Sequence, residues 1–194
     1  MDISQLFLQR YTVLYDFWLA DFWNLVPEEL MRQRPHPRVN SIAWVMWHLT
    51  RVEDGGLNRF VANRPQVLDE DDWLKRLNLP WRHNGNGMGF VEVDGLSKRV
   101  DMQALHGYSM AVHQRTLEIT KNLTMDSLAP IMEVEDLRKI LFEEGWARTA
   151  DPALVDNYRG WTKGKCLLNF GLTHPYQHVG EIGVISSLLG VEFE

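Results

Sequence analysis

Apolar residues along the chain follow a helical spacing in four long segments. In each of them large apolar side chains recur every three or four positions, which is the period of an amphipathic helix and not of a strand. Asn40 or Ser41 is a suitable N-cap for the second segment, Pro65 follows that segment, and the third segment starts near Asp101. The sequence therefore predicts four long helices. They cover residues 3–26, 40–63, 101–123 and 163–189.

The connections between these helices are long and carry elements of their own. Residues 69–79 and 135–144 each fit a short helix, and Asp151 followed by Pro152 is typical of the start of another. Residues 82–98 are rich in glycine and lack helical periodicity, so we expect a long loop or a small hairpin there. The pattern predicts an all-α fold, a four-helix bundle with long connections containing short helices.

The composition limits the number of domains, the partners and the cellular setting that we expect. The 194 residues, 45% of them hydrophobic, suffice for one substantial core, so we expect a single domain over residues 1–194. A net charge of −6 without long runs of like charge argues against a nucleic-acid partner. No stretch reaches the roughly 18 consecutive apolar residues of a membrane helix. A lone cysteine, Cys166, and a first segment without a secretion signal favour a reducing, cytoplasmic setting.

Two of the predicted core helices carry histidines on their apolar faces. His48 lies in the apolar stripe of the second long helix, and His174 and His178 are four residues apart on one face of the last. A buried imidazole without a partner costs about 1–3 kcal/mol, so these nitrogens need ligands or hydrogen bonds. Neutral imidazole is the commonest side-chain metal ligand, and three with open coordination positions are typical of a catalytic site. We therefore predict a metal site formed by these three histidines.

The alternative for each ring is a hydrogen-bonded core histidine. The spacing of the pair is weak evidence alone, because such a pair arises by chance in about one of five sequences with this many histidines. His106 and His113 are expected at the rim of their helix, and Glu53 and Asp54 are expected to face solvent. The Glu-x-x-His and His-Glu-x-x-His patterns of di-iron bundles and zinc proteases are absent.

Glu181 follows His178 by three residues and lies near the same helical face. It is the candidate catalytic residue, either as the acceptor of a hydrogen bond from a ligating ring or as a base acting on metal-bound water. A carboxylate at the rim in solvent is the alternative.

The phrase Trp47-His48-Leu49 with acidic residues soon after, and His174-x-x-x-His178-x-Gly180-x-Ile182 in the last helix, resembles the DinB-like superfamily of damage-inducible metalloenzymes. The resemblance implies a four-helix bundle in which His48, His174 and His178 bind a divalent metal, zinc or nickel, with exchangeable positions. It also implies a homodimer, and a low-molecular-weight thiol as cosubstrate. The chain departs from the family where Val179-Gly180-Glu181 replaces a common Arg-Gly-Gln, and where Pro175 replaces an acidic residue.

The favoured function is a divalent-metal-dependent enzyme acting on a small molecule. A bound metal lowers the pKa of a coordinated water or thiol and so generates a nucleophile near neutral pH. The sequence leaves a thiol-dependent transferase and a hydrolase equally open. The alternative from another class is a non-catalytic metal-binding or stress-response helical bundle.

Overall fold

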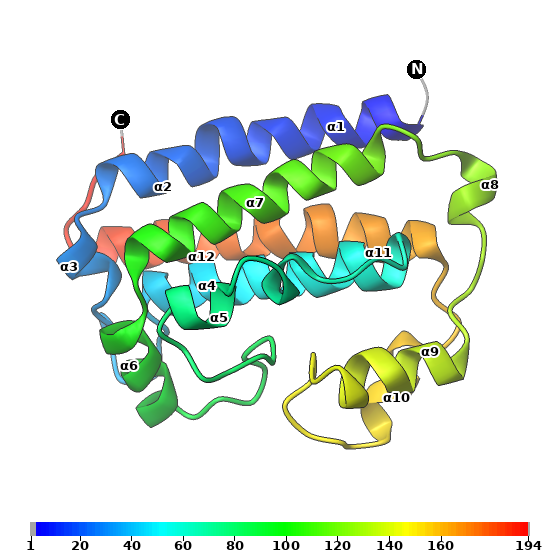
Figure 1. Ribbon diagram of the computed structural model, residues 1–194. Helices are drawn as coiled ribbons and strands as arrows, with labels where there is room; N and C mark the ends of the chain where they lie inside the picture. The colour runs from blue at the N-terminus through cyan, green and yellow to red at the C-terminus, as the bar shows by residue number, and fades with distance from the viewer. Residues whose placement is uncertain (1–2, 194) are drawn as a thin grey trace.

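Four helical rods form the body of the protein in the computed structural model, which describes residues 3–193 (Figure 1). Three of the rods contain a π-helical segment, labelled η1, η2 or η5. The first rod is α1 (Ile3–Val13), η1 (Leu14–Leu19) and α2 (Ala20–Leu25), and the second is α4 (Ile42–Glu53) and η2 (Asp54–Val61). The third is α7 (Met102–Thr120), and the fourth is α11 (Lys163–Leu168), η5 (Asn169–Thr173) and α12 (His174–Leu188). Each predicted long helix is present.

Short helices fill the connections. They are α3 (Glu28–Met31), η3 (Val67–Asp69), α5 (Trp73–Arg76), α6 (Phe90–Arg99), α8 (Met125–Leu128), α9 (Val134–Arg138), η4 (Lys139–Glu143) and α10 (Ala153–Tyr158). Helices α5, α6, α9 and α10 lie along one side of the bundle, and α3 and α8 lie at its two ends (Figure 1). Within residues 3–193 there is no strand, and the β-type pairing is limited to an isolated bridge between Ile131 and Thr162. The predicted all-α bundle is confirmed.

The prediction of a loop or hairpin over residues 82–98 is wrong in its second half, which forms α6. The glycines lie in the first half, whereas Val93, Leu96 and Val100 recur at helical spacing and are buried. The side chain of Glu92 accepts a hydrogen bond from the Gly89 backbone N–H at 2.9 Å and so caps the start of the helix. The glycine-rich composition of the first half led us to overlook the helical spacing of apolar residues in the second half.

Helix α4 is the central helix, since every residue from Ile42 to Glu53 is buried. Its start is fixed by Ser41, whose hydroxyl accepts a hydrogen bond from the backbone N–H of Trp44 at 3.1 Å. It packs against α12, α7 and α6. The expectation that Glu53 and Asp54 face solvent is wrong, because both side chains lie against neighbouring rods and are 0% exposed. A helix covered on all sides has no solvent face for its charged residues.

The last rod contains Pro175, and the π-helical segment η5 ends directly before α12, the helix that carries this proline. Proline lacks a backbone N–H and is tolerated in a first helical turn, where that group has no intrahelical partner. Pro175 is the second residue of α12. The rod therefore continues past the proline, and both His174 and His178 lie in the first turns of α12.

Across residues 3–193, no helix is both long enough and apolar enough to cross a lipid bilayer.

Candidate metal centre

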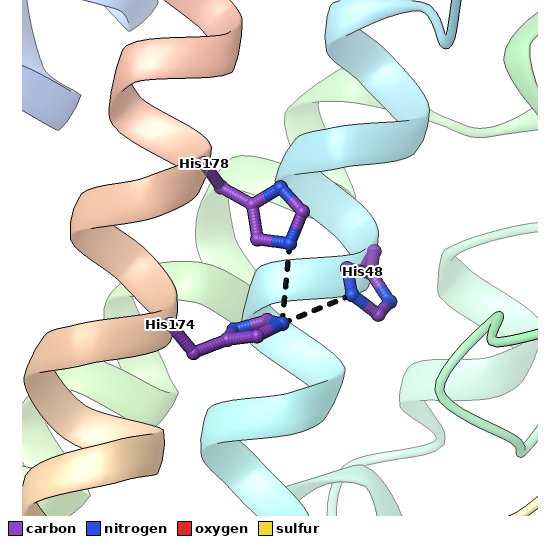
Figure 2. Close-up of side chains that lie close together, drawn as sticks. All are labelled: His48, His174 and His178. Atoms are coloured by element: carbon purple, nitrogen blue, oxygen red, sulfur yellow. Dashed lines mark hydrogen bonds between the residues drawn. The ribbon is translucent and has the colours of Figure 1, made fainter.

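The three predicted histidines lie together between α4 and α12 (Figure 2). The Nε2 atom of His174 lies 3.1 Å from the Nε2 atom of His48 and 3.1 Å from the Nε2 atom of His178. One ring nitrogen of each histidine lies within 4.8 Å of the other two. Residues separated by 126 positions in the chain thus converge on one point.

His48 is held in a fixed orientation. Its ring stacks on that of Trp44, one turn earlier in α4, with centroids 4.8 Å apart and planes 9° from parallel. Its Nδ1 atom makes a short contact with the backbone carbonyl oxygen of Asn84. A carbonyl oxygen can only accept a hydrogen bond, so Nδ1 must carry the proton of the neutral ring. The lone pair of His48 is therefore on Nε2 and points into the cluster.

The same reasoning applies to His178. Its Nδ1 atom lies 2.7 Å from Oε2 of Glu181, and the other carboxylate oxygen of Glu181 accepts a hydrogen bond from Asn40 at 3.3 Å. Burial alone would raise the pKa of Glu181, but its interactions with His178, Asn40 and His48 together outweigh burial, so the net pKa is lowered. An ionised carboxylate accepts the Nδ1 proton, and in this tautomer of the neutral ring the Nε2 lone pair of His178 points at the cluster.

His174 completes the cluster. Two lone pairs face its Nε2 atom, and its Nδ1 atom is buried without a hydrogen-bond partner among residues 3–193. One proton on Nε2 cannot satisfy both neighbours fully, whereas a cation at the centre would accept a lone pair from each ring.

Burial, and then the neighbouring histidines, lower the pKa of His174 to about 2. Burial lowers the pKa of His48 to about 4. Rings that are neutral at pH 7 are in the state that metal ligation requires.

The donor set fits a divalent transition metal. Imidazole nitrogen suits zinc, copper, iron and nickel, while oxygen ligands suit magnesium and calcium. Hydrogen bonds from the second nitrogens of His48 and His178 to a carbonyl and a carboxylate are the arrangement that ligating histidines make in metal sites. The chemistry of the cluster is thus compatible with a metal site with open positions.

The family of the chain follows from its sequence. The family model described as the DinB superfamily matches residues 19–182, a range that includes all three histidines. The chain belongs to the DinB superfamily. A solved structure described as a conserved protein from Enterococcus faecalis is 16% identical, has a TM-score of 0.70, and covers 98% of this chain and 99% of that chain. At that identity the likeness shows the fold alone. No curated protein matches this DinB-superfamily chain.

A second buried polar cluster in this DinB-superfamily protein was not predicted. Tyr11 and Tyr15 from the first rod and Thr116 from α7 donate hydrogen bonds to Glu53, those from Tyr15 and Thr116 at 2.6 and 2.7 Å. His113, expected at the rim, is buried at 5% exposure and its Nδ1 lies 3.3 Å from the Tyr11 hydroxyl. The sequence feature that could have indicated this cluster is the pair of tyrosines four residues apart in the first long helix, because a buried tyrosine hydroxyl needs a hydrogen-bond partner.

A buried arginine links α4 to the loop that holds His48. Arg51, one turn after His48, pairs with Asp54 at 3.0 Å and donates hydrogen bonds to the backbone carbonyl of Arg82 at 3.0 and 2.6 Å. Arg82 lies two residues before Asn84, whose carbonyl contacts His48. The loop is therefore fixed to α4 at two neighbouring points.

The remaining candidates lie apart from the cluster. His106 is exposed and stacks on Trp23, as a rim residue would. Cys166 is fully buried, and burial raises the pKa of its thiol to about 12. A thiol that stays protonated is a poor ligand and nucleophile, so Cys166 acts as a small core residue.

Proposed function

We propose that this chain is a divalent-metal-dependent enzyme in which His48, His174 and His178 hold zinc or nickel. The observation that carries the proposal is the convergence of three imidazole Nε2 atoms, with the rings of His48 and His178 oriented by Asn84 and Glu181. A metal with three protein ligands retains open positions, and when bound it would lower the pKa of a coordinated water or thiol.

Residues around the three histidines would orient the ligating rings and leave the bound metal accessible to a small molecule. Asn84 and Glu181 hold the rings of His48 and His178, so that metal binding costs little reorganisation. The side chains of His178 and Glu181 are 17% and 31% exposed, so a small molecule can approach from that side. Both oxygens of Glu181 are engaged, one by His178 and one by Asn40, which favours an orienting role for Glu181; its role as a base remains a prediction.

Metal analysis tests the site. We expect roughly one zinc or nickel ion per chain after reconstitution, loss of that ion in His178→Ala, and retention in the matched control His106→Ala, which removes an exposed histidine outside the cluster. If the wild type retains no more metal than His178→Ala, the proposed centre is wrong.

Turnover tests the reaction class. A transferase would conjugate glutathione or cysteine with 1-chloro-2,4-dinitrobenzene, and a hydrolase would release nitrophenol from 4-nitrophenyl acetate. Either activity should depend on added metal and disappear in His178→Ala but not in His106→Ala. Metal binding without turnover in a wider set of thiols, electrophiles and esters would favour the non-catalytic bundle.

We also propose that the protein forms a homodimer in a reducing, cytoplasmic setting. Large apolar side chains are exposed along the first rod and the end of α12, which pack side by side. They are Phe17, Trp18, Leu25, Val184 and Leu188. Phe17 is 63% and Val184 62% exposed, an apolar face that a second copy would cover in a two-fold arrangement. The lone, buried Cys166 supports the reducing setting.

Sedimentation equilibrium tests the dimer. Phe17→Glu should shift the mass toward the monomer, whereas Val91→Glu, at a residue 85% exposed on α6, should leave it unchanged. A wild-type monomer at micromolar concentration, or a dimer equally stable in both variants, would contradict this interface.

A further inference from the structure

A pocket of about 460 Å³ lies between the loop at residues 84–87 and the segment at residues 141–158. Its volume is in the range of pockets that bind small molecules. Neither of the segments that form it contains a ligand of the candidate metal centre. The pocket is therefore a separate feature that the metal proposal does not explain.

One residue belongs both to this pocket and to the surroundings of the metal centre. Asn84 lines the pocket, its backbone carbonyl contacts Nδ1 of His48, and its backbone N–H donates a hydrogen bond to the carbonyl of Trp146 at 3.0 Å. Trp146 lines the same pocket, and its Nε1 donates to the backbone carbonyl of Arg51 at 3.1 Å. The pocket thus adjoins α4 within one turn of His48.

The wall formed by Trp146 is firmly placed. Its indole lies against Gly55, where a Cβ atom would stand only 2.0 Å from Nε1, so the glycine is what allows the ring to approach α4. Trp146 is 1% exposed and packs against Phe60 and Phe170. The ring therefore gives the pocket a rigid apolar boundary.

The lining is mostly apolar, and its charged residue is already paired. Leu141, Trp146, Leu154 and Tyr158 supply the apolar surface. Arg148 is the charged residue among those that line the pocket, and its guanidinium already binds both carboxylate oxygens of Glu92 at 2.8 and 2.9 Å. This ion pair leaves little positive charge for an anionic ligand. The guanidinium also donates a hydrogen bond to the backbone carbonyl of Gly87 at 2.5 Å, which joins the two walls.

We propose that this pocket binds an uncharged apolar small molecule. The proposal rests on the pocket alone, so it can fail or hold independently of the metal centre.

The binding test uses N-phenyl-1-naphthylamine, an uncharged aromatic probe whose fluorescence rises in apolar surroundings, with the full-length protein. Ala147→Trp fills the pocket and Leu154→Glu places a charge in it. Each should weaken probe binding at least about tenfold, equivalent to about 1.4 kcal/mol. The matched control is Ala129→Trp, which fills a separate apolar pocket of about 230 Å³ lined by Leu128 and Leu167, and should leave the affinity unchanged.

Further measurements distinguish loss of ligand binding from loss of folding and from loss of the metal. Circular dichroism of each variant checks folding, and either of the two pocket variants suffices if the other does not fold. The anionic analogue 8-anilinonaphthalene-1-sulfonate should bind more weakly than the uncharged probe. His178→Ala, which lacks a metal ligand, should keep probe binding even where it loses metal, so the pocket is measured independently of the metal centre.

The proposal is overturned if folded Ala147→Trp and Leu154→Glu bind the probe as the wild type does, or if Ala129→Trp is the variant that weakens binding. Tighter binding of the anionic analogue, lost in Arg148→Gln, would replace the uncharged ligand by an anion.

Discussion

Replacing Glu53 by glutamine tests the electrostatics of the core. Glu53 is 0% exposed and accepts hydrogen bonds from Tyr11, Tyr15 and Thr116. Burial raises its pKa from 4.5 to about 7, although the three hydroxyl donors act in the opposite direction. The folded protein therefore holds this proton more tightly than the unfolded chain does. By linkage, the stability that Glu53 contributes is full below about pH 4.5, falls as the pH rises toward about 7, and is constant above it.

The size of the effect follows from the same values. A pKa of 4.5 in the unfolded chain and about 7 in the folded protein corresponds to about 3 kcal/mol of stability lost between acid and alkaline pH. Glu53→Gln removes this titration but leaves every other ionisable group in place. Its stability relative to the wild type should rise by about 3 kcal/mol between about pH 4.5 and about pH 8. Any fixed cost of the amide among the hydroxyl groups does not change with pH.

Urea denaturation followed by circular dichroism measures this difference at several pH values. Titrations of the histidines and surface acids are common to both proteins and cancel in the comparison. Glu118→Gln is the matched control, since the side chain of Glu118 is 59% exposed and its substitution should give a flat difference. A wild-type to Glu53→Gln difference that is also flat would refute the reasoning, because it would mean that the hydroxyl groups fully offset the burial of the charge.

Three further substitutions test the surroundings of the metal centre. Glu181→Gln should weaken zinc binding by about 10- to 100-fold in a competitive chelator titration, because the charge that orients its histidine partner is lost. Arg51→Met leaves Asp54 buried and unpaired, and should lower the urea-derived stability by about 3–5 kcal/mol. Gly85→Ala should cost at least about 1–2 kcal/mol, since φ is +92° and the new Cβ would lie 2.6 Å from the Trp47 ring. Unchanged zinc affinity in the first variant, or wild-type stability in the other two, would contradict the corresponding contact.

The long helices could be predicted because their apolar residues repeat at a local period, and the DinB resemblance depended on short motifs within two of those helices. The convergence of His48 with His174 and His178 followed from placing all three on inward faces. The burial of Glu53 did not follow, because a local pattern marks one inward face and α4 is covered on every side. The residues that cover its other faces come from rods that are distant in the sequence, and a local pattern carries no information about them.

The contacts between the metal centre and the connections that surround it were not predicted, for a related reason. Asn84 acts through its backbone carbonyl, which every residue type possesses, so its identity gives no sign of the role. Trp146 lies 95 positions from Arg51, its hydrogen-bond partner, in a connection without long-range periodicity. Residues that serve through their backbone, or through irregular connections, become visible only when the tertiary contacts are known.

The burial of α4 also ties the metal centre to the neighbouring pocket. A helix without a solvent face must find partners for its polar side chains within the protein, and two of these partners belong to one loop. His48 contacts the carbonyl of Asn84, and Arg51 donates to the carbonyl of Arg82. Since Asn84 also lines the pocket, a ligand that displaces this loop must strain the orientation of His48. For such a ligand, metal affinity and pocket occupancy would be coupled by the same free energy in both directions. A probe that leaves the loop in place should bind equally well with and without the metal.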